Sequence, residues 1–183
     1  MKHDEETPFS YPVKVGHISV NPVEVKIAAD ADECRALARQ WDIREVRSFS
    51  AELQVQRWKK DGVRVKGRVR TDIVQSCVVT LDPVESQIDE PIDAVFVPEG
   101  SKLALHPVVE GGEMLLDPDG PDSPEVFHGD TIDVGVVAVE YAALAIDPYP
   151  RKAGVAFSGH VEHTDEDDGR PSPFAVLKDW KKD

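Results

Sequence analysis

Four basic side chains occupy alternate positions between residues 64 and 70, and this spacing is the feature of the sequence most suited to binding chemistry. They are Arg64, Lys66, Arg68 and Arg70. The positions beside them hold valine or glycine, and such a period of two is typical of a strand with one buried face. At about 3.3 Å per residue, the four cations would form a basic ridge roughly 20 Å long. A ridge of this kind could contact phosphate or carboxylate groups.

Three further cations, Arg57, Lys59 and Lys60, precede the ridge and are expected to extend it around a hairpin tip. The turn is predicted at residues 59–62, where Asp61-Gly62 is a strong hairpin signal. The alternative interpretation of the ridge is a solvated edge strand, whose charges suppress pairing between sheet edges.

The charge of the chain is distributed unevenly. The 183 residues carry a formal net charge of −14, from 21 Lys and Arg against 35 Asp and Glu. Residues 1–83 hold 14 basic and 13 acidic groups, whereas residues 84–147 hold 15 acidic groups and only Lys102 as a cation. Large fields of one sign steer partners and oppose self-association. The second segment is therefore a candidate surface for a basic partner.

Few motifs of known catalytic chemistry are present. The chain has neither a glycine-rich phosphate loop nor a G-x-S-x-G nucleophile turn, and its six histidines lack ligand spacing. The crowded acids Asp117, Asp119, Asp122 and Glu125 suggest calcium, but they lack the spacing and closing Glu of an EF-hand loop. We predict no metal, no cofactor and no enzymatic activity, although carboxylates are too plentiful to rule out a catalytic pair.

The two cysteines, Cys34 and Cys77, are expected to be structural thiols in a reducing compartment, because they fall in a predicted helix and a predicted buried strand. No stretch approaches the ~20 apolar residues of a membrane span. Residues 1–7 contain no apolar run of a secretory signal. A cytoplasmic location is expected.

The hydrophobic pattern predicts an α+β fold, with an antiparallel, curved or barrel-like β-sheet, two packed helices and a short C-terminal helix. Strands are expected at 23–27, 49–58, 61–83 and 84–97. The stretch 61–83 would be one long strand or two strands meeting at a bend, and its apolar run from Ile73 to Leu81 suits burial on both faces. Pro91 is expected to interrupt the last strand.

The two helices are predicted at 32–41, capped by Asp30 or Asp32, and at 134–146, capped by Asp133. The second is apolar nearly all round and should be buried against the sheet, with Glu140 at its narrow exposed edge. These elements define one domain over 8–161, within which residues 155–161 could add an edge strand.

The end of the chain differs in composition from this domain. Residues 162–171 are expected to be an acidic flexible tether, because residues 162–168 carry five acidic side chains and no apolar one. Residues 172–183 form a C-terminal amphipathic segment with Pro173 in its first turn. This segment would dock either on its own domain or in a groove of a partner.

Four segments together resemble a bacterial family, the YceD-like large ribosomal RNA subunit accumulation proteins, a domain of unknown function. They are Gln75–Val84 (QSCVVTLDPV), Asp133–Glu140 (DVGVVAVE), Ile146–Arg151 (IDPYPR) and Ser172–Leu177 (SPFAVL). The sequence of the first segment, with one cysteine before Val-Thr-Leu-x-Pro-Val, resembles that of the alphaproteobacterial members of the family. Other members carry Cys-x-x-Cys there. This chain has Thr80 in place of the second cysteine, which removes the metal site that such a pair would imply.

The resemblance implies a role in the accumulation of large-subunit (23S) rRNA and in ribosome assembly, with no catalytic residues to carry over. The positions that match the family's recurrent ones are Cys77, Thr80, Leu81, Pro83, Glu140, Pro150, Arg151, Pro173 and Phe174. They could equally be packing and turn residues. Two binding hypotheses remain open: capture of a basic ribosomal protein by the acidic segment, and direct rRNA binding by the seven cations. A small-molecule-binding barrel or an enzyme of unknown reaction is the alternative.

Overall fold

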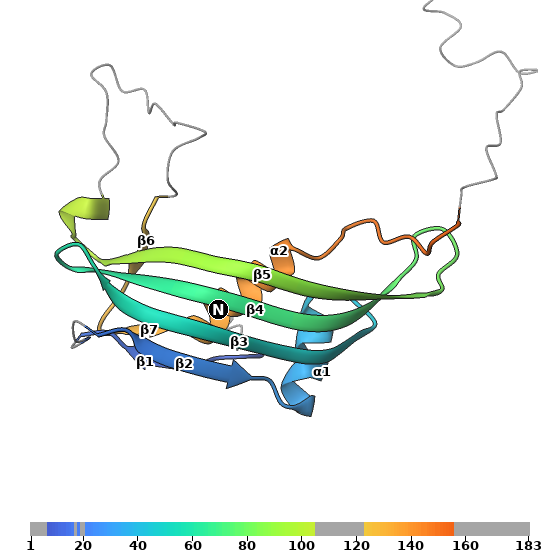
Figure 1. Ribbon diagram of the computed structural model, residues 1–183, viewed down its shortest axis with the longest axis horizontal. Coiled ribbons are helices and arrows are strands. Elements are labelled where there is room, and N and C mark those ends of the chain that lie inside the picture. The colour runs from blue at the N-terminus through green and yellow to red at the C-terminus, as the bar shows by residue number, and fades with distance from the viewer. Residues whose placement is uncertain (1–6, 17, 19–20, 105–122, 156–183) are drawn as a thin grey trace, which may run out of the picture.

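The computed structural model describes residues 7–16, 18, 21–104 and 123–155 of the chain. Its centre is a five-stranded sheet in the order β2-β3-β4-β5-β6 (Figure 1). The strands are β2 (Val23–Ala28), β3 (Glu45–Trp58), β4 (Gly62–Ser76), β5 (Pro83–Pro98) and β6 (Glu125–Phe127). All neighbours pair antiparallel except β5 and β6. The predicted α+β class with a largely antiparallel, curved sheet is confirmed, and the sheet is open.

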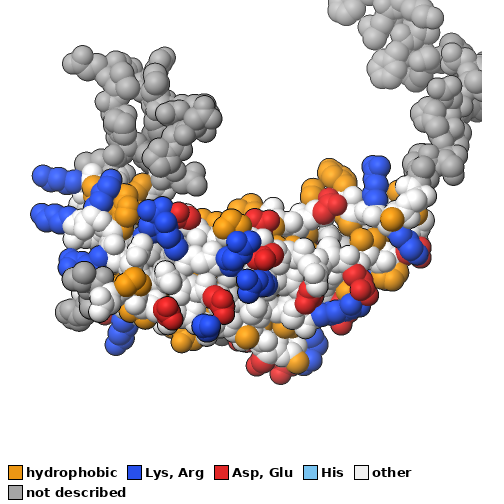
Figure 2. Space-filling model, viewed as in Figure 1, with side chains coloured by type: hydrophobic (Ala, Val, Ile, Leu, Met, Phe, Trp, Pro, Cys, Tyr) orange, Lys and Arg blue, Asp and Glu red, His pale blue; other side chains and the backbone are white. Residues whose placement is uncertain are grey.

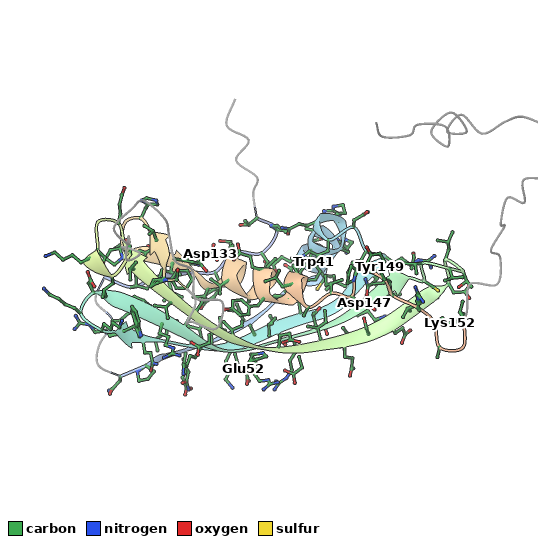
Figure 3. All side chains as sticks on the ribbon, turned by 90° about the horizontal axis from the view of Figure 1, so that it is seen from above. Trp41, Glu52, Asp133, Asp147, Tyr149 and Lys152 are labelled. Atoms are coloured by element: carbon green, nitrogen blue, oxygen red, sulfur yellow. The ribbon has the colours of Figure 1, made fainter. Side chains whose placement is uncertain are left out.

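Two helices and a small ribbon cover one face of the sheet (Figure 3). The helices are α1 (Ala31–Gln40) and α2 (Val134–Leu144). The ribbon pairs β1 (Pro12–Lys14) with β7 (Thr131–Asp133), and a 3₁₀ turn, η1 (Lys102–Ala104), follows β5. We call the covered side the inner face and the opposite side, from which Glu52 projects, the outer face.

Both helices begin where their capping residues predict. The Asp30 carboxylate accepts hydrogen bonds from the Asp32 and Glu33 amides, and the Asp30 amide donates to the Glu33 carboxylate, which completes a capping box. The Asp133 carboxylate accepts from the Gly135 and Val136 amides at the start of α2. Local hydrogen bonds therefore mark both starting points, and at Asp133 a further bond from the Tyr11 amide joins them.

The core lies between the inner face and the helices. Phe49 of β3 is 2% exposed and packs edge-on against Phe9 at 5.1 Å between ring centroids. Val65, Val69 and Leu37 are fully buried in the same cluster. Helix α2 is buried on most sides, and Glu140 lies on its exposed edge, as expected.

The turn between β3 and β4 lies where it was predicted, but for a different reason. The residue in the left-handed region is Lys59, with φ of 53°, rather than Gly62 of the Asp-Gly pair. Gly62 is needed because a Cβ there would lie 2.7 Å from the Trp58 ring and 2.9 Å from its carbonyl oxygen. The close packing of the tryptophan, and not the turn type, thus selects glycine.

Two strand predictions need correction. Strand β4 ends at Ser76, and residues 77–82 form the turn into β5, so the apolar run to Leu81 is not a strand buried on both faces. Val78 is 46% and Leu81 67% exposed. Pro91 does not interrupt β5, which pairs with β4 throughout, with Pro91 opposite Arg68. A proline fits here because this part of β5 lacks a second neighbour among the described residues.

The other expectations about the chain ends fall outside the described residues. They are the possible edge strand up to residue 161, the acidic tether 162–171 and the C-terminal segment 172–183. Residues 105–122, which include Asp117, Asp119 and Asp122, are outside as well. No helix in the described part of the chain is long and apolar enough to span a membrane.

Candidate functional site

The basic ridge exists as a row on the outer face of β4. Val63, Val65 and Val69 point into the core and are at most 4% exposed. The four cations between and beyond them therefore project from the other side. The period-two pattern correctly placed these side chains on one face.

Carboxylates of the neighbouring strand β5 pair with all four ridge cations. Arg64 holds Asp93 through two hydrogen bonds of 2.6 Å, and Lys66 Nζ lies 3.6 Å from the same carboxylate. Arg68 binds Asp89 at 2.8 Å. Arg70 Nε lies 3.5 Å from the other oxygen of Asp89. The antiparallel register causes this, because Lys66 is opposite Asp93 and Arg70 is opposite Asp89.

The pairing changes the electrostatics of both partners. Hydrogen bonds from Arg68 hold the pKa of Asp89 below its usual value, and those from Arg64 do the same for Asp93. Because both carboxylates stay ionised at neutral pH, four positive charges on β4 face two negative charges on β5. Each exposed pair contributes little to stability, because water screens the attraction and ordering the side chains costs entropy. The consequence for binding is larger, since the ridge presents much less net charge than its sequence indicates.

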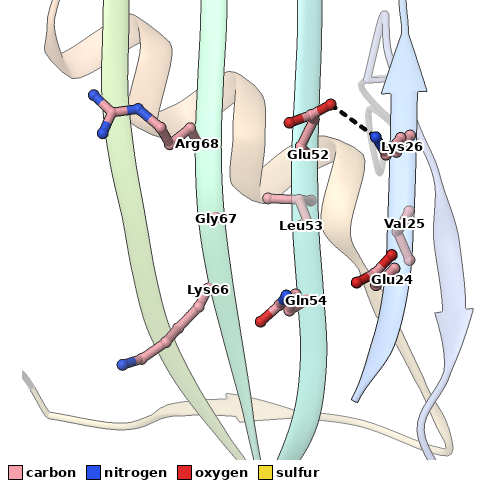
Figure 4. A pocket seen from close by; sticks show the side chains of 9 residues that line it. All are labelled: Glu24, Val25, Lys26, Glu52, Leu53, Gln54, Lys66, Gly67 and Arg68. Carbon is pink, nitrogen blue, oxygen red and sulfur yellow. Dashed lines mark hydrogen bonds and ion pairs between the residues drawn. The ribbon is translucent and has the colours of Figure 1, made fainter.

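The rest of the outer face is also mixed in sign. A shallow hollow of about 350 Å³ crosses β2, β3 and β4 beside the ridge (Figure 4). Glu24, Gln54 and an ion pair of 3.0 Å between Lys26 and Glu52 line it together with Lys66 and Arg68. Such alternating charges do not form a continuous anion-binding surface.

The hairpin tip differs from the ridge. Arg57, Lys59 and Lys60, with Trp58 between them, form what we call the tip cluster. Within the described residues, none of these three cations forms an ion pair with a carboxylate. Arg57 donates to the Lys60 carbonyl at 3.3 Å, and Lys59 Nζ lies 4.1 Å from the centre of the Trp58 ring. Figure 2 shows cationic side chains gathered at this end of the molecule.

A recess of about 570 Å³ adjoins the tip cluster. Arg57 and Lys60 lie at its wall, and apolar surface comes from Val15, directly after β1, and from Phe127 of β6. Asp61 and Asp130 also line it, so the recess combines both charges with an apolar side. The structure thus divides the seven predicted binding cations into a paired group of four and an unpaired group of three.

Several residues of the family-like segments meet at the opposite end of the sheet. Cys77 is fully buried at the start of the β4–β5 turn, and its sulfur accepts a hydrogen bond from the Lys152 amide at 3.5 Å. The hydroxyl of Thr80, followed by the amides of Lys152, Thr80 and Val79, lowers the pKa of the Cys77 thiol to about 6.

The same turn fixes the segment that follows α2. The Val78 amide donates to the Pro150 carbonyl at 2.9 Å, and Lys152 pairs with Asp82 at 3.1 Å. Leu81 adopts a left-handed conformation with φ of 62°. Of the other family-like positions, Pro83 begins β5 and Arg151 is exposed, while Pro173 and Phe174 lie outside the described residues. These contacts indicate a joint between the β4–β5 turn and residues 150–152.

A pair of acidic side chains stands apart from the ion pairs. Partial burial, and then the charge of Glu140 on α2, raise the pKa of Glu125 at the start of β6. No cation of the described residues pairs with either carboxylate. Groups of three or more His, Cys, Asp or Glu that could hold a metal are absent from the described residues. Asp117, Asp119 and Asp122 fall outside them.

The pairing of the ridge was missed by the sequence reasoning. The sequence did contain a signal for this pairing. Glu85, Gln87, Asp89 and Asp93 occupy alternate positions of β5, so their side chains lie on one face of the strand. Once β5 is accepted as a continuous strand next to β4, opposite charges in register follow.

One protein-family model matches a large part of this chain. The model of the family described as large ribosomal RNA subunit accumulation protein YceD matches residues 65–181, well over half of the chain. The chain belongs to the YceD family. The YceD match begins within β4 and includes the β4–β5 turn, α2 and the segment after it. The family name implies a role in the accumulation of large-subunit rRNA, and YceD is not a family of known enzymes. Neither the curated proteins nor the solved structures gave a match.

Proposed function

We propose that this protein is a non-enzymatic factor that supports 23S rRNA accumulation and ribosome assembly by contacting rRNA through its tip cluster. The observation that carries this proposal is the absence of carboxylate partners for Arg57, Lys59 and Lys60 among the described residues. A protein cation that binds a phosphate releases counterions from the RNA, and this release favours binding. A cation that a carboxylate already neutralises releases fewer of them, so it contributes less to the affinity. The tip therefore offers more binding energy per charge than the ridge.

The aromatic ring at the tip supports the same proposal. Trp58 is half-buried over Gly62 and carries Lys59 above its ring. Aromatic rings stack on unpaired bases, which contributes about 1–3 kcal/mol per base in single-strand binding proteins. A base could displace the flexible Lys59 side chain, which would then be available for a phosphate. The tip thus combines charge and stacking, which the ridge lacks.

The ridge keeps a secondary role in this proposal. Its four cations outnumber the two aspartates that bind them, so Arg64, Lys66, Arg68 and Arg70 still contribute a weak positive field near the tip. Such a field raises association rates more than it holds a complex together.

Binding of a large-subunit rRNA fragment tests the proposal. The variant Arg57→Gln/Lys59→Gln/Lys60→Gln removes the tip charges, and Lys26→Gln/Glu52→Gln is a matched control that removes an ion pair without changing net charge. We expect binding to weaken at least tenfold in the tip variant and to stay within twofold in the control. Cells that carry only the tip variant should accumulate less 23S rRNA. Equal affinity of all three proteins would exclude the tip as the contact.

A second candidate function, capture of a basic ribosomal protein, is favoured by one observation. The charge of Glu140 acts on Glu125, and neither carboxylate pairs with a cation among the described residues, so an incoming Lys or Arg would be attracted to both. Glu125→Gln/Glu140→Gln should then reduce co-purification of such a protein, whereas Glu24→Gln/Glu52→Gln should not. Unchanged recovery in the first variant would remove this acidic pair from the mechanism.

A further inference from the structure

Two hollows lie next to each other at the α1 end of the molecule. The larger, about 650 Å³, lies between α1 and the start of β3. The smaller, about 410 Å³, lies between the end of β4 and residues 148–150. Ile43 and Arg44 line both. We call the two hollows together the α1 groove.

The floor of the α1 groove is apolar along its length. Ala29, Ala38 and Val46 contribute to the larger hollow, and the last two are 8% and 5% exposed. Val78, 46% exposed, and Pro150 contribute to the smaller hollow. This floor suits small and medium apolar side chains laid along it.

The rim of the α1 groove carries four arginines and three carboxylate residues, Asp30, Asp42 and Glu45. Arg35 and Arg47 are each paired with nearby carboxylates. Arg39 and Arg44 form no ion pair within the described residues. Arg44 donates to the Ser76 hydroxyl at 2.7 Å and to the Leu81 carbonyl at 2.6 Å, both uncharged acceptors. Its guanidinium is thus held in place without a carboxylate in ion-pair contact, although its charge also acts on Asp82. Such a cation can still bind an incoming carboxylate.

The described chain ends beside this groove. The Pro150 carbonyl is fixed to the Val78 amide in the wall of the smaller hollow, and the description stops five residues later at Val155. Residues 162–168 carry five carboxylates, and Phe174, Val176, Leu177 and Trp180 follow. At ~3.3 Å per residue, the seven residues from 155 to 162 span up to about 23 Å. The carboxylates can therefore reach the arginines, and the apolar residues can reach the floor.

We propose that residues 162–180 of this chain dock in the α1 groove. Acidic side chains of 162–168 meet Arg39 and Arg44, and the apolar side chains after Pro173 lie on the floor. The covalent link makes the same chain the favoured occupant, because a short flexible tether gives an effective concentration in the millimolar range. A tail from a second copy would have to compete at ordinary protein concentrations. This docking is independent of the tip cluster, which belongs to the opposite end of the sheet.

Intramolecular cross-linking in the full chain tests the docking. Ala31, which is exposed and lines the groove, is changed to Cys together with Ala175→Cys in the tail. The matched control combines Gln54→Cys on the outer face with the same Ala175→Cys. Both natural thiols are buried and can stay in place. A short bis-maleimide should link the groove pair at least fivefold more efficiently than the control pair, and thermal melting checks that each variant is folded.

The charge contribution is tested in the same assay. Adding Arg39→Glu to the groove pair should lower the intramolecular yield at least threefold, and 0.5 M salt should lower it as well. Equal yields for the groove and control pairs would overturn the proposal, as would cross-links formed only between two chains. A yield unchanged by Arg39→Glu, together with weaker binding of an rRNA fragment by that variant, would assign the groove to RNA instead and also overturn it.

Discussion

The salt dependence of rRNA binding counts the cations that contact phosphates, and it separates the tip cluster from the basic ridge. Each neutralised phosphate contributes a slope of about −0.7 on single strands or −0.9 on duplexes to log K against log salt. Three tip cations predict a slope of about −2 to −3, so affinity should fall roughly 20-fold to 40-fold between 50 and 200 mM salt. All seven cations would predict a fall of roughly 1,000-fold to 6,000-fold.

The assay is a titration of a labelled large-subunit rRNA fragment with the protein at four salt concentrations. The variant Arg57→Gln/Lys59→Gln/Lys60→Gln should reduce the slope to near zero. Arg68→Gln/Asp89→Asn removes one ridge cation and the carboxylate bound to it, so the net charge of the face is preserved. Because Arg70 also loses its contact with Asp89, we expect the slope to become steeper by at most one phosphate, about −0.7 to −0.9, and not to be reduced. A slope of about −5 or steeper that the Arg68→Gln/Asp89→Asn variant also reduces would refute the division between tip and ridge.

Four further predictions concern the fold that positions these groups. Gly67→Ala should destabilise the protein by about 3 kcal/mol or more in chemical denaturation, because its Cβ would lie 2.0 Å from the Glu52 carbonyl oxygen. Asp133→Ala should cost about 1–2 kcal/mol in the same measurement by removing the α2 cap; no loss would show that the cap is dispensable. The folded-state pKa of Asp89 is lowered, so its contribution to stability is complete above about pH 4 and lost as the pH falls through the lowered pKa; acid unfolding of Asp89→Asn should therefore depend less on pH. The pKa of Cys77 is lowered to about 6 from 9.0, so stability should rise as the pH increases from 6 to 9; Cys77→Ser should lose that rise, and an identical pH profile would contradict the hydrogen-bonded thiolate.

The parts of the fold set by local chemistry could be predicted from the sequence. Alternation of apolar residues placed β3 and β4, and Asp30 and Asp133 placed the helix starts, because caps and periodicity depend on neighbours along the chain. The turn at residues 77–82 was missed because its left-handed residue is Leu81 rather than glycine, inside an apolar run typical of a buried strand.

The candidate site could be predicted only in part. The seven cations were visible in the sequence, but the pairing of Asp89 and Asp93 with the ridge depends on the register between β4 and β5. Pro91 favoured a break in β5 and so concealed that register. Unpaired charge is a property of the assembled sheet, since it depends on which side chains another strand brings alongside.

Cross-linking of bound rRNA to the wild-type protein by ultraviolet light, followed by mass spectrometry of the peptides, tests the central claim most directly. We predict that nucleotides attach to the peptide that contains Trp58, Lys59 and Lys60. Attachment confined to the outer face of β4 between Arg64 and Arg70, or no rRNA attached at all, would contradict it.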